Sequence, residues 1–436
     1  MSGPTPPPRA RLPLGLLALA LALASLGPAC SASAELACED EQCPSGQVCG
    51  ATGCEGITPP DPTTTDLGRY TSTALTADKR LVAATYDAAG GNLVVAREQA
   101  DGALALEIVD GWSVRGRDVV DTDSGLWTDL VVTDTATHLV WFDKTAGALR
   151  YAVQPTGESW SVETVDGGDG AVRGTHACLA VKEGVVHVAY RDESARALRY
   201  ARRELDGTWK IRVVDVCAGE PDCVSPATGL AAADDEDYGE WADIAVIGQM
   251  PRIAFYDRRR GDLKMAARRE GGVWETNTLD GRDPTTGEDT GDVGRFVSLA
   301  LTAGRQPGLA YYDATRGALR YLVPGNQPVV VDAGTFSDPE TGVTKSSPVG
   351  QFVRLRYSPD DHAVMIYLDA SAIALKEAIV SGANVVAVRR LDALDPGVFV
   401  GFDVVEDRLV GAYGAWVAGE APRTRLATFD LPLVTP

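Results

Sequence analysis

Residues 295–320 read RFVSLALTAGRQPGLAYYDATRGALR, and the same pattern recurs through most of the chain. The first nine of these residues match RYTSTALTA, at residues 69–77, in six positions. Short runs rich in aromatic and β-branched residues, separated by Gly, Asp or Pro turns, are typical of antiparallel strands. Self-similarity at a regular spacing indicates a repeat architecture. We therefore interpret the chain from residue 68 onward as repeats of one β-unit.

Each repeat ends its expected second strand with an aromatic residue and an aspartate. These aspartates are Asp87, Asp143, Asp192, Asp257, Asp313 and Asp369. Seven residues later, on the expected third strand, the chain carries Val94, Arg150, Arg199, Lys264, Arg320 and Lys376. A fourth strand follows, often opened by Trp and closed by Asp, as from Trp274 to Asp280. Four short antiparallel strands per repeat form the pattern of a β-propeller blade.

The number of repeats sets the number of blades. Six complete units end near Asp392, and a seventh begins at Phe399 with three clear strands. A fourth strand for this last unit is expected either from residues 432–436 (PLVTP) or from the linker before Gly68. We predict an all-β fold, a seven-bladed β-propeller of four-stranded antiparallel blades, with six or eight blades as the alternatives. No segment shows helical periodicity.

The first 30 residues predict export. Arg9 and Arg11 precede an uncharged run at residues 12–26, LPLGLLALALALASL, as in a signal peptide. Residues 27–30 resemble a bacterial lipobox, although Gly27 stands where that pattern has leucine. Cleavage is therefore expected either before Cys30, which would carry a lipid, or after Ala34. We expect a bacterial outer-membrane lipoprotein or a secreted or periplasmic protein, which contacts a membrane through the lipid alone.

A small cysteine-rich module is expected at residues 31–57, after the signal peptide (residues 1–30). It contains Cys38, Cys43, Cys49 and Cys54, whose spacings lack the close pairs of a zinc site. In an exported chain such a cluster predicts disulfides. Of the three possible connectivities, we favour Cys38–Cys49 with Cys43–Cys54. The CPSGQVC core resembles small modules that follow signal peptides in secreted bacterial proteins.

The remaining cysteines and the linker complete the domain organisation. Cys217 and Cys223 are expected to form a disulfide around a tight loop, and Cys178 is expected to be a buried free thiol. Residues 58–67 form a linker rich in Pro and Thr. The propeller is then expected to cover residues 68–436.

The repeat motif, aromatic-Asp followed by Gly-x-Leu-Arg-Tyr-Ala, resembles the units of secreted bacterial propellers. More distantly it resembles sialidase-like and fungal fucose-lectin-like propellers, over about residues 68–431. The resemblance implies the fold, whereas propellers serve many functions. The Ser-x-Asp part of the sialidase boxes is missing, and no HExxH, GxSxG or P-loop motif occurs. We therefore expect a protein that is not an enzyme, and we assign no catalytic residue.

The charge of the chain limits its partners. With 61 acidic and 40 basic residues the net charge is −21, which argues against binding nucleic acid or an anionic membrane surface. The long connections between fourth and first strands share one face and carry dense acidic runs. We predict an exported, monomeric binding or scaffold protein that engages a protein or glycan at the cell surface through this acidic loop face. The alternatives are a lectin with one sugar site per blade, and a glycoside hydrolase or lyase of the sialidase-like propeller type.

Two sets of residues are candidate binding sites. The charged residues of the repeat hairpins form either cross-strand ion pairs or lectin sites: Asp143, Asp192, Asp257, Asp313, Asp369, Arg150, Arg199, Lys264, Arg320 and Lys376. Acids of the loop face, whose oxygens suit calcium, are Asp234, Asp235, Asp237, Asp283, Asp289 and Asp292. No cofactor other than calcium is expected.

Aromatic residues at the starts of strands form a further repeated set. Trp160, Trp209 and Trp274 open fourth strands and are expected to pack between blades rather than to carry sugars. Equivalent residues at the starts of first strands, which are assigned the same packing role, are Trp127, Trp241, Phe296, Phe352 and Phe399.

Overall fold

The structure is a computed structural model that describes residues 47–50, 53–56, 66–115, 118–217, 237–283, 285–337, 342–394, 397–417 and 423–434. The chain divides into two units, residues 1–57 and residues 58–436. In the described part of the first unit, β1 (Gln47–Gly50) and β2 (Gly53–Gly56) form an antiparallel hairpin that places Cys49 opposite Cys54.

Several predictions for the ends of the chain fall outside these residues. Cys30, Cys38, Cys43 and Cys223 are among the residues not described, as are the signal segment and most of the linker. The lipid anchor, the cleavage site and the three expected disulfides therefore stay predictions. Within the described part of the chain, no helix is long and apolar enough to cross a membrane.

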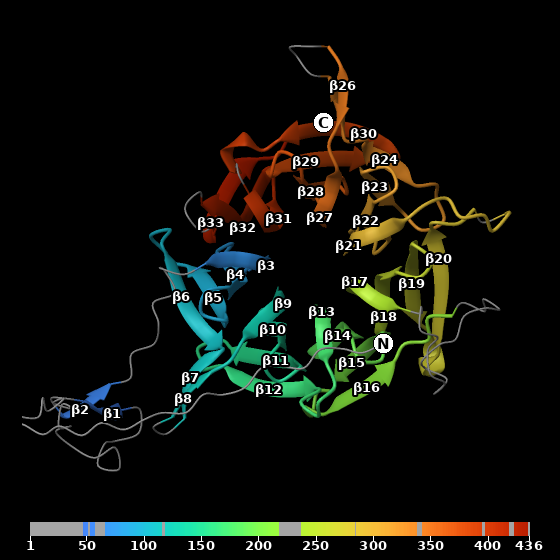
Figure 1. The fold of residues 1–436 in the computed structure, drawn as a ribbon. Helices are drawn as coiled ribbons and strands as arrows, with labels where there is room; N and C mark the ends of the chain where they lie inside the picture. Colours follow the sequence, from blue (N-terminus) through green and yellow to red (C-terminus); the bar gives the residue numbers. More distant parts are fainter. Residues whose placement is uncertain are drawn as a thin grey trace, which may run out of the picture. The chain divides into compact units, whose positions relative to one another are not determined.

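The second unit is a ring of seven antiparallel sheets, so the predicted fold class is confirmed (Figure 1). Blade 1 consists of β3 (Leu67–Leu75), β4 (Leu81–Asp87), β5 (Asn92–Glu98) and β6 (Leu104–Asp110). Blade 2 consists of β9 (Ser124–Val132), β10 (Ala136–Asp143), β11 (Ala148–Pro155) and β12 (Ser161–Asp166). Blade 3 consists of β13 (Arg173–Lys182), β14 (Val185–Asp192), β15 (Ala197–Arg203) and β16 (Trp209–Val213).

The remaining blades follow in chain order. Blade 4 consists of β17 (Tyr238–Ile247), β18 (Met250–Asp257), β19 (Asp262–Arg268) and β20 (Trp274–Asp280). Blade 5 consists of β21 (Val293–Leu301), β22 (Pro307–Asp313), β23 (Ala318–Leu322) and β24 (Val329–Asp332). Blade 6 consists of β27 (Val349–Tyr357), β28 (Ala363–Asp369), β29 (Ala374–Ser381) and β30 (Asn384–Arg390). Blade 7 consists of β31 (Gly397–Val405), β32 (Arg408–Val417) and β33 (Arg423–Pro432).

Blade 7 has three strands in the described part of the chain. The described part of the expected terminal strand, residues 432–434, does not form a separate fourth strand, because β33 itself continues to Pro432. The linker alternative lies outside the described residues except for Asp66 and Leu67, the last two residues of the linker. The two ends of the ring are instead joined at Asp66, whose carboxylate accepts hydrogen bonds from the Thr424 backbone N–H and hydroxyl, at 2.5 and 2.9 Å.

The second strands end at the predicted aspartates because these residues cap the hairpin turns that follow. The Asp143 carboxylate accepts a hydrogen bond from the Ala146 N–H at 2.8 Å, and Asp313 accepts one from the Arg316 N–H at 2.9 Å. Side-chain oxygens of aspartate commonly satisfy turn N–H groups in this way. The turn motif therefore explains why the aspartate recurs at the same place in each hairpin.

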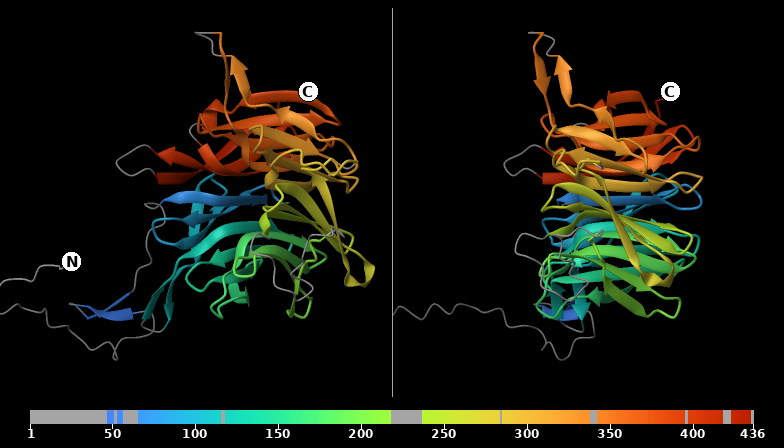
Figure 2. Two further views of the ribbon diagram at one scale, coloured as in Figure 1. Left: turned by 45° about the vertical axis from the view of Figure 1, so that its right-hand side comes forward. Right: turned by 90° about the vertical axis from the view of Figure 1, so that its right-hand side faces the viewer.

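The connections between blades carry two further hairpins. β7 (Trp112–Arg115) pairs with β8 (Asp118–Asp121) between blades 1 and 2, and β25 (Thr335–Ser337) pairs with β26 (Thr344–Ser346) between blades 5 and 6. Both lie in fourth-to-first connections, where the long insertions were predicted. The β25–β26 hairpin projects beyond the blades in the side views (Figure 2). Two 3₁₀ turns, η4 (Glu270–Gly272) and η5 (Asp392–Leu394), complete the described elements.

The hydrophobic core lies between neighbouring sheets. One cluster joins Val82 and Ala84 of blade 1 to Leu139 and Trp141 of blade 2, and the other clusters join successive blades in the same way. The tryptophans that open fourth strands also pack between blades, as predicted: Trp209 of blade 3 lies edge-on to Tyr151 of blade 2, at 5.3 Å between ring centroids. Each blade is therefore stabilised by its two neighbours.

A glycine near the start of the inner strand brings adjacent blades close together. Gly294 has φ +105°, and a Cβ there would lie 2.9 Å from the Cα of Leu263 in the preceding blade. Gly68, Gly125, Gly174, Gly239 and Gly350 hold the same place with φ between +93° and +120°. A side chain at this position would push two backbones apart.

We expect Gly294→Ala to lower the free energy of unfolding by about 3 kcal/mol, because it adds overpacking to the strain of a positive φ. The matched control is Gly287→Ala, at φ +73° with open space around the new Cβ, which should cost about 1–2 kcal/mol. Urea unfolding of both variants checks the difference. Equal losses would show that the close approach to Leu263 is not a constraint.

Candidate binding site on the propeller axis

The inner strands place a ring of aromatic side chains around the axis, which we call the aromatic collar. Its members, one from each blade, are Tyr70, Trp127, His176, Trp241, Phe296, Phe352 and Phe399. Each ring contacts the next at 4.0–5.6 Å between centroids, and the contact between Phe399 and Tyr70 closes the circle. The inner-strand aromatics thus pack blade against blade, as predicted, and together they form a closed ring of contacts around the axis.

The backbone of the collar is strained in the same way in every blade. All seven collar residues have φ between 49° and 55°, a left-handed conformation that residues other than glycine rarely adopt. The ladders between first and second strands shift register at this point, as at residues 295 and 298 in blade 5. A β-bulge therefore turns each aromatic side chain toward the axis. Strain of this kind persists where surrounding structure enforces it, and it is frequent at functional sites.

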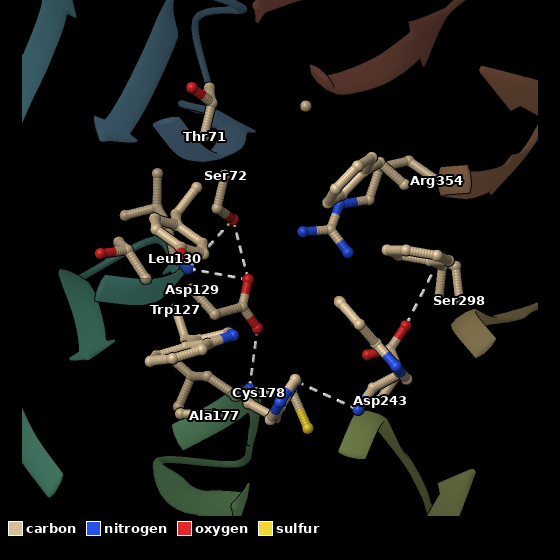
Figure 3. A pocket seen from close by; sticks show the side chains of 18 of the residues that line it. Thr71, Ser72, Trp127, Asp129, Leu130, Ala177, Cys178, Asp243, Ser298 and Arg354 are labelled. Carbon is tan, nitrogen blue, oxygen red and sulfur yellow. Dashed lines mark hydrogen bonds between the residues drawn. The ribbon is translucent and has the colours of Figure 1, made fainter. Parts of the chain in front are cut away.

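A second layer lies two residues farther along each inner strand, and we call it the polar layer. Its members are Ser72, Asp129, Cys178, Asp243, Ser298, Arg354 and Gly401. The collar and the polar layer line a cavity of about 240 Å³ on the axis (Figure 3). This volume is slightly below the ~300–1,000 Å³ of pockets for drug-sized ligands.

Four members of the polar layer tie their blade to the next one. The Ser72 hydroxyl accepts the Leu130 N–H at 3.2 Å, and Asp129 accepts the Leu179 N–H at 2.8 Å. Asp243 and Ser298 likewise accept N–H groups of blades 5 and 6, at 2.7 and 3.1 Å. These bonds satisfy N–H groups next to the bulges, which would otherwise be buried without a partner.

Asp129 and Asp243 are held firmly by further contacts. Asp129 also accepts hydrogen bonds from the Ser72 hydroxyl at 2.8 Å and from its neighbour's N–H at 3.0 Å. Asp243 also accepts the Ile244 N–H at 2.8 Å and the Ser298 hydroxyl at 3.3 Å. Burial raises the pKa of Asp243 to about 6; the Leu299 N–H opposes the shift, and the charge of Asp129 adds to it.

Cys178, Arg354 and Gly401 do not make this bond to the next blade: the Cys178 thiol donates to the Ala189 carbonyl of its own blade, Gly401 has no side chain, and Arg354 carries a charge. A guanidinium has five N–H donors and no acceptor, so it cannot bind the N–H of the next blade. Within the part of the chain that the structure describes, Arg354 has no hydrogen bond or ion pair, and its charge acts on Asp243 only at longer range, where it opposes the rise in the pKa of that carboxyl. Its side chain points into the cavity (Figure 3). Arg356, two residues farther on, is paired with Asp403 at 3.2 Å and with the Leu355 carbonyl at 2.9 Å.

The other ionisable groups of the lining are neutral. Burial lowers the pKa of His176 to about 3, and its Nδ1 accepts the Trp241 N–H at 3.2 Å. Cys178 is a buried free thiol, as predicted, and burial raises its pKa well above the usual value. The charges facing the cavity are therefore those of the two aspartates and of the two arginines.

The charged hairpin residues lie elsewhere, at the junctions between blades. Arg320 of blade 5 forms ion pairs of 2.8 Å with Asp313 of its own hairpin and with Asp280, which closes blade 4. The Tyr311 hydroxyl donates to the same Asp280 carboxylate at 2.6 Å.

The same arrangement recurs with variations. Arg199 bridges Asp192 and Asp166 at 2.8 and 3.0 Å. In the other blades Arg150 pairs with Asp110, Lys376 with Asp332, and the fully buried Lys264 with Asp257, while Asp369 accepts the Ser347 hydroxyl. The contacts described are those of an inter-blade ion network. A sugar-binding role for these residues is not tested and stays a prediction.

Blade 1 lacks this network for a structural reason. It carries Thr85 and Val94 where blade 5 carries Tyr311 and Arg320. The aspartate that such a cation would meet belongs to the fourth strand of the preceding blade, and the described part of blade 7 has no fourth strand. Blade 1 therefore lacks the basic residue on its third strand, and the described part of blade 7 lacks the fourth strand that would carry the partner aspartate.

The described acids of the loop face are engaged within the protein. Asp237 pairs with Arg191 at 2.8 Å, and Asp292 pairs with Arg295 at 2.5 Å. Asp283 and Asp289 accept turn N–H groups. Asp234 and Asp235 lie outside the described residues. Among the residues that are described, no three His, Cys, Asp or Glu side chains could hold a metal ion, and calcium binding stays a prediction.

Comparisons with known proteins found only distant structural similarities. No family model and no curated protein matches the chain. Among solved structures, AofleA from Arthrobotrys oligospora is 12% identical, with 71% of this chain and 90% of that chain covered and a TM-score of 0.42. Polysaccharide lyase Uly1 is 10% identical (83% and 89% covered, TM-score 0.47), and puromycin hydrolase is 14% identical (86% and 54% covered, TM-score 0.49). These likenesses carry no argument about function.

The inter-blade network should contribute measurably to stability. Asp280→Ala would leave the Tyr311 hydroxyl and one side of Arg320 without an acceptor, so we expect a loss of about 2–4 kcal/mol in the free energy of unfolding. Asp78→Ala removes an exposed pair with Arg80 and should have little effect. Urea unfolding measures both. A loss at Asp280 no larger than that at Asp78 would refute the structural role.

The raised pKa of Asp243 predicts a specific dependence of stability on pH. Because the folded state binds this proton more tightly, the group stabilises the fold at low pH, and this contribution is lost as pH rises from 3.8 to about 6. The loss should reach about 3 kcal/mol. Asp243→Asn stays neutral and should lack it. Unfolding free energies of both proteins between pH 4 and 7 test this, and parallel curves would contradict it.

Proposed function

We propose that this chain is an exported, non-enzymatic binding protein that holds a small polar ligand in the axial cavity. The observation that carries the proposal is Arg354, whose guanidinium points into the cavity and has no hydrogen bond or ion pair among the described residues, whereas the carboxylates of Asp129 and Asp243 are fixed by hydrogen bonds. A guanidinium has five N–H donors, and in this cavity the protein satisfies none of them with a hydrogen bond from the described residues. A ligand would satisfy them.

The acidic loop face gives less support to the protein or glycan partner expected from the sequence. Asp237 and Glu240 lie against Arg191, at 2.8 and 2.9 Å. Arg258 also pairs with both, at 3.6 and 3.0 Å, while Arg191 is shared with Glu193, so most of this negative charge is offset within the chain. A lectin with one site per blade would likewise need the hairpin charges to face a sugar, whereas Asp280, Arg320 and Asp313 already bind one another.

One observation favours a second candidate, a glycoside hydrolase or lyase that uses the same cavity. Asp129 and Asp243 share the site, and burial raises the pKa of Asp243 to about 6, which suits a general acid. Both carboxylates, however, already accept three hydrogen bonds each. Turnover of a chromogenic glycoside that is lost in Asp243→Asn would establish this candidate in place of the first.

A thermal-shift screen tests the proposed binding function. The probes are amino acids, organic acids, monosaccharides, polyols and nucleosides. We expect at least one to raise the Tm of the wild-type protein saturably, by a few degrees near 100 Kd, and to have no effect on Arg354→Ala. Arg212→Ala, which removes an exposed arginine on β16, should respond like the wild type. The proposal fails if no probe binds, or if binding survives in Arg354→Ala.

A further inference from the structure

We infer that the axial cavity binds a small zwitterion of about amino-acid size, a molecule that carries one carboxylate and one ammonium group. This inference rests on the proposed binding function and names its class of ligand.

The carboxylate of the ligand is assigned to Arg354. Its guanidinium offers a planar fork of N–H donors that matches a carboxylate with two parallel hydrogen bonds. The described part of the chain provides this fork with no internal acceptor, whereas Arg356 on the same strand has both a carboxylate and a carbonyl partner. Arg354 is therefore a positively charged donor of the lining that is available to a ligand; the buried Thr73 hydroxyl, which also has no partner among the described residues, is a neutral one.

The ammonium group of the ligand is assigned to Asp129 and Asp243. A carboxylate has about four acceptor sites. Asp129 uses three of them, for Ser72, Leu130 and Leu179. Asp243 also uses three, for Ile244, Ser298 and Leu299. Each carboxylate thus keeps one acceptor site for a ligand. The hydrogen bonds from the protein fix the orientation of the carboxylate, and with it the direction of the remaining site, before a ligand binds.

The balance of charge favours a zwitterion over a simple ion. A simple anion would meet Arg354 but would be repelled by Asp129 and Asp243 in the same cavity. A simple cation would meet the two carboxylates but would leave Arg354 unpaired and would be repelled by it. A zwitterion gives each charge of the cavity an opposite charge and leaves the net charge unchanged, which matters most where burial weakens screening.

The size and walls of the cavity limit the rest of the ligand. The volume of about 240 Å³ suits a molecule of amino-acid size rather than an oligosaccharide or a peptide. The collar adds aromatic surface from Tyr70, Trp127 and Trp241 next to the charged groups. Aromatic faces attract cations, so they support the ammonium end and any apolar substituent near it.

Isothermal titration calorimetry on the whole protein tests the ligand class. The probes are the standard amino acids and glycine betaine, followed by two analogues of the tightest binder, one without the ammonium group and one without the carboxylate. We expect each analogue to bind at least about tenfold more weakly than the zwitterion, because each loses a charge-assisted contact.

Two variants should separate the roles of the two charges. Arg354→Gln should weaken the zwitterion and the carboxylate-only analogue at least about tenfold and spare the ammonium-only analogue. Asp243→Asn should do the reverse. Arg354→Lys should retain part of the affinity, and Arg212→Gln should retain all of it. A misfolded variant would lose all three probes together, so the crossed pattern cannot arise from damage to the fold.

The outcomes distinguish this inference from the proposed function. If neutral sugars or simple carboxylates bind through Arg354 as tightly as zwitterions, the inference is wrong while the binding function stands. If binding of the zwitterion is unchanged in both Arg354→Gln and Asp243→Asn, the ligand lies elsewhere and both fail. If none of these probes and no probe of the wider screen binds, both are also overturned.

Discussion

The ring depends on satisfying the backbone N–H groups that the bulges of the inner strands release. Each bulge interrupts the ladder to the second strand, and the N–H three residues beyond the collar loses its partner in that ladder. In four blades a serine or aspartate of the preceding blade supplies the acceptor, as Asp129 does for Leu179. A buried N–H without a partner is costly, so this requirement sets both the spacing of the blades and the choice of side chain at the axis.

The same requirement explains why the axis can hold a site. A position that accepts a neighbour's N–H must carry an acceptor, which excludes most residue types. Arg354 cannot meet this need, and it stands where a serine or aspartate would serve the structure better. Departures from a repeated structural rule are expected at functional positions. Cys178 and Gly401 depart from the rule too, but Arg354 is the departure that places a charge in the cavity, beside two immobilised carboxylates.

The sequence predicted the fold because the blade is a local unit. The aromatic-Asp ends of the second strands, the turns that follow and the tryptophans of the outer strands depend on residues close together in the chain, and all lie where they were expected. The last blade, which has three strands in the described part of the chain, was less predictable, since nothing in the sequence of residues 432–436 distinguishes a new strand from the continuation of β33.

The axial site could not be predicted in the same way. Asp129, Asp243 and Arg354 are separated by more than a hundred residues at each step, and only the closed ring brings them together. The sequence nevertheless contained a signal. Most inner strands begin with the motif Gly-x-aromatic, and the residue of the polar layer follows two positions after the aromatic one. The bulge changes which face of the sheet the aromatic side chain points to. The simple alternation of side chains along a strand therefore does not predict which of them meet on the axis.

The junction between Asp66 and Thr424 has a consequence for how the chain folds. These residues are 358 positions apart, whereas every other blade packs against the blade that precedes it in the chain. Blades can therefore form in order as the chain emerges, each on the previous one. Closure must wait until β33 has been made, so the axial cavity is the last part of the molecule to come into existence.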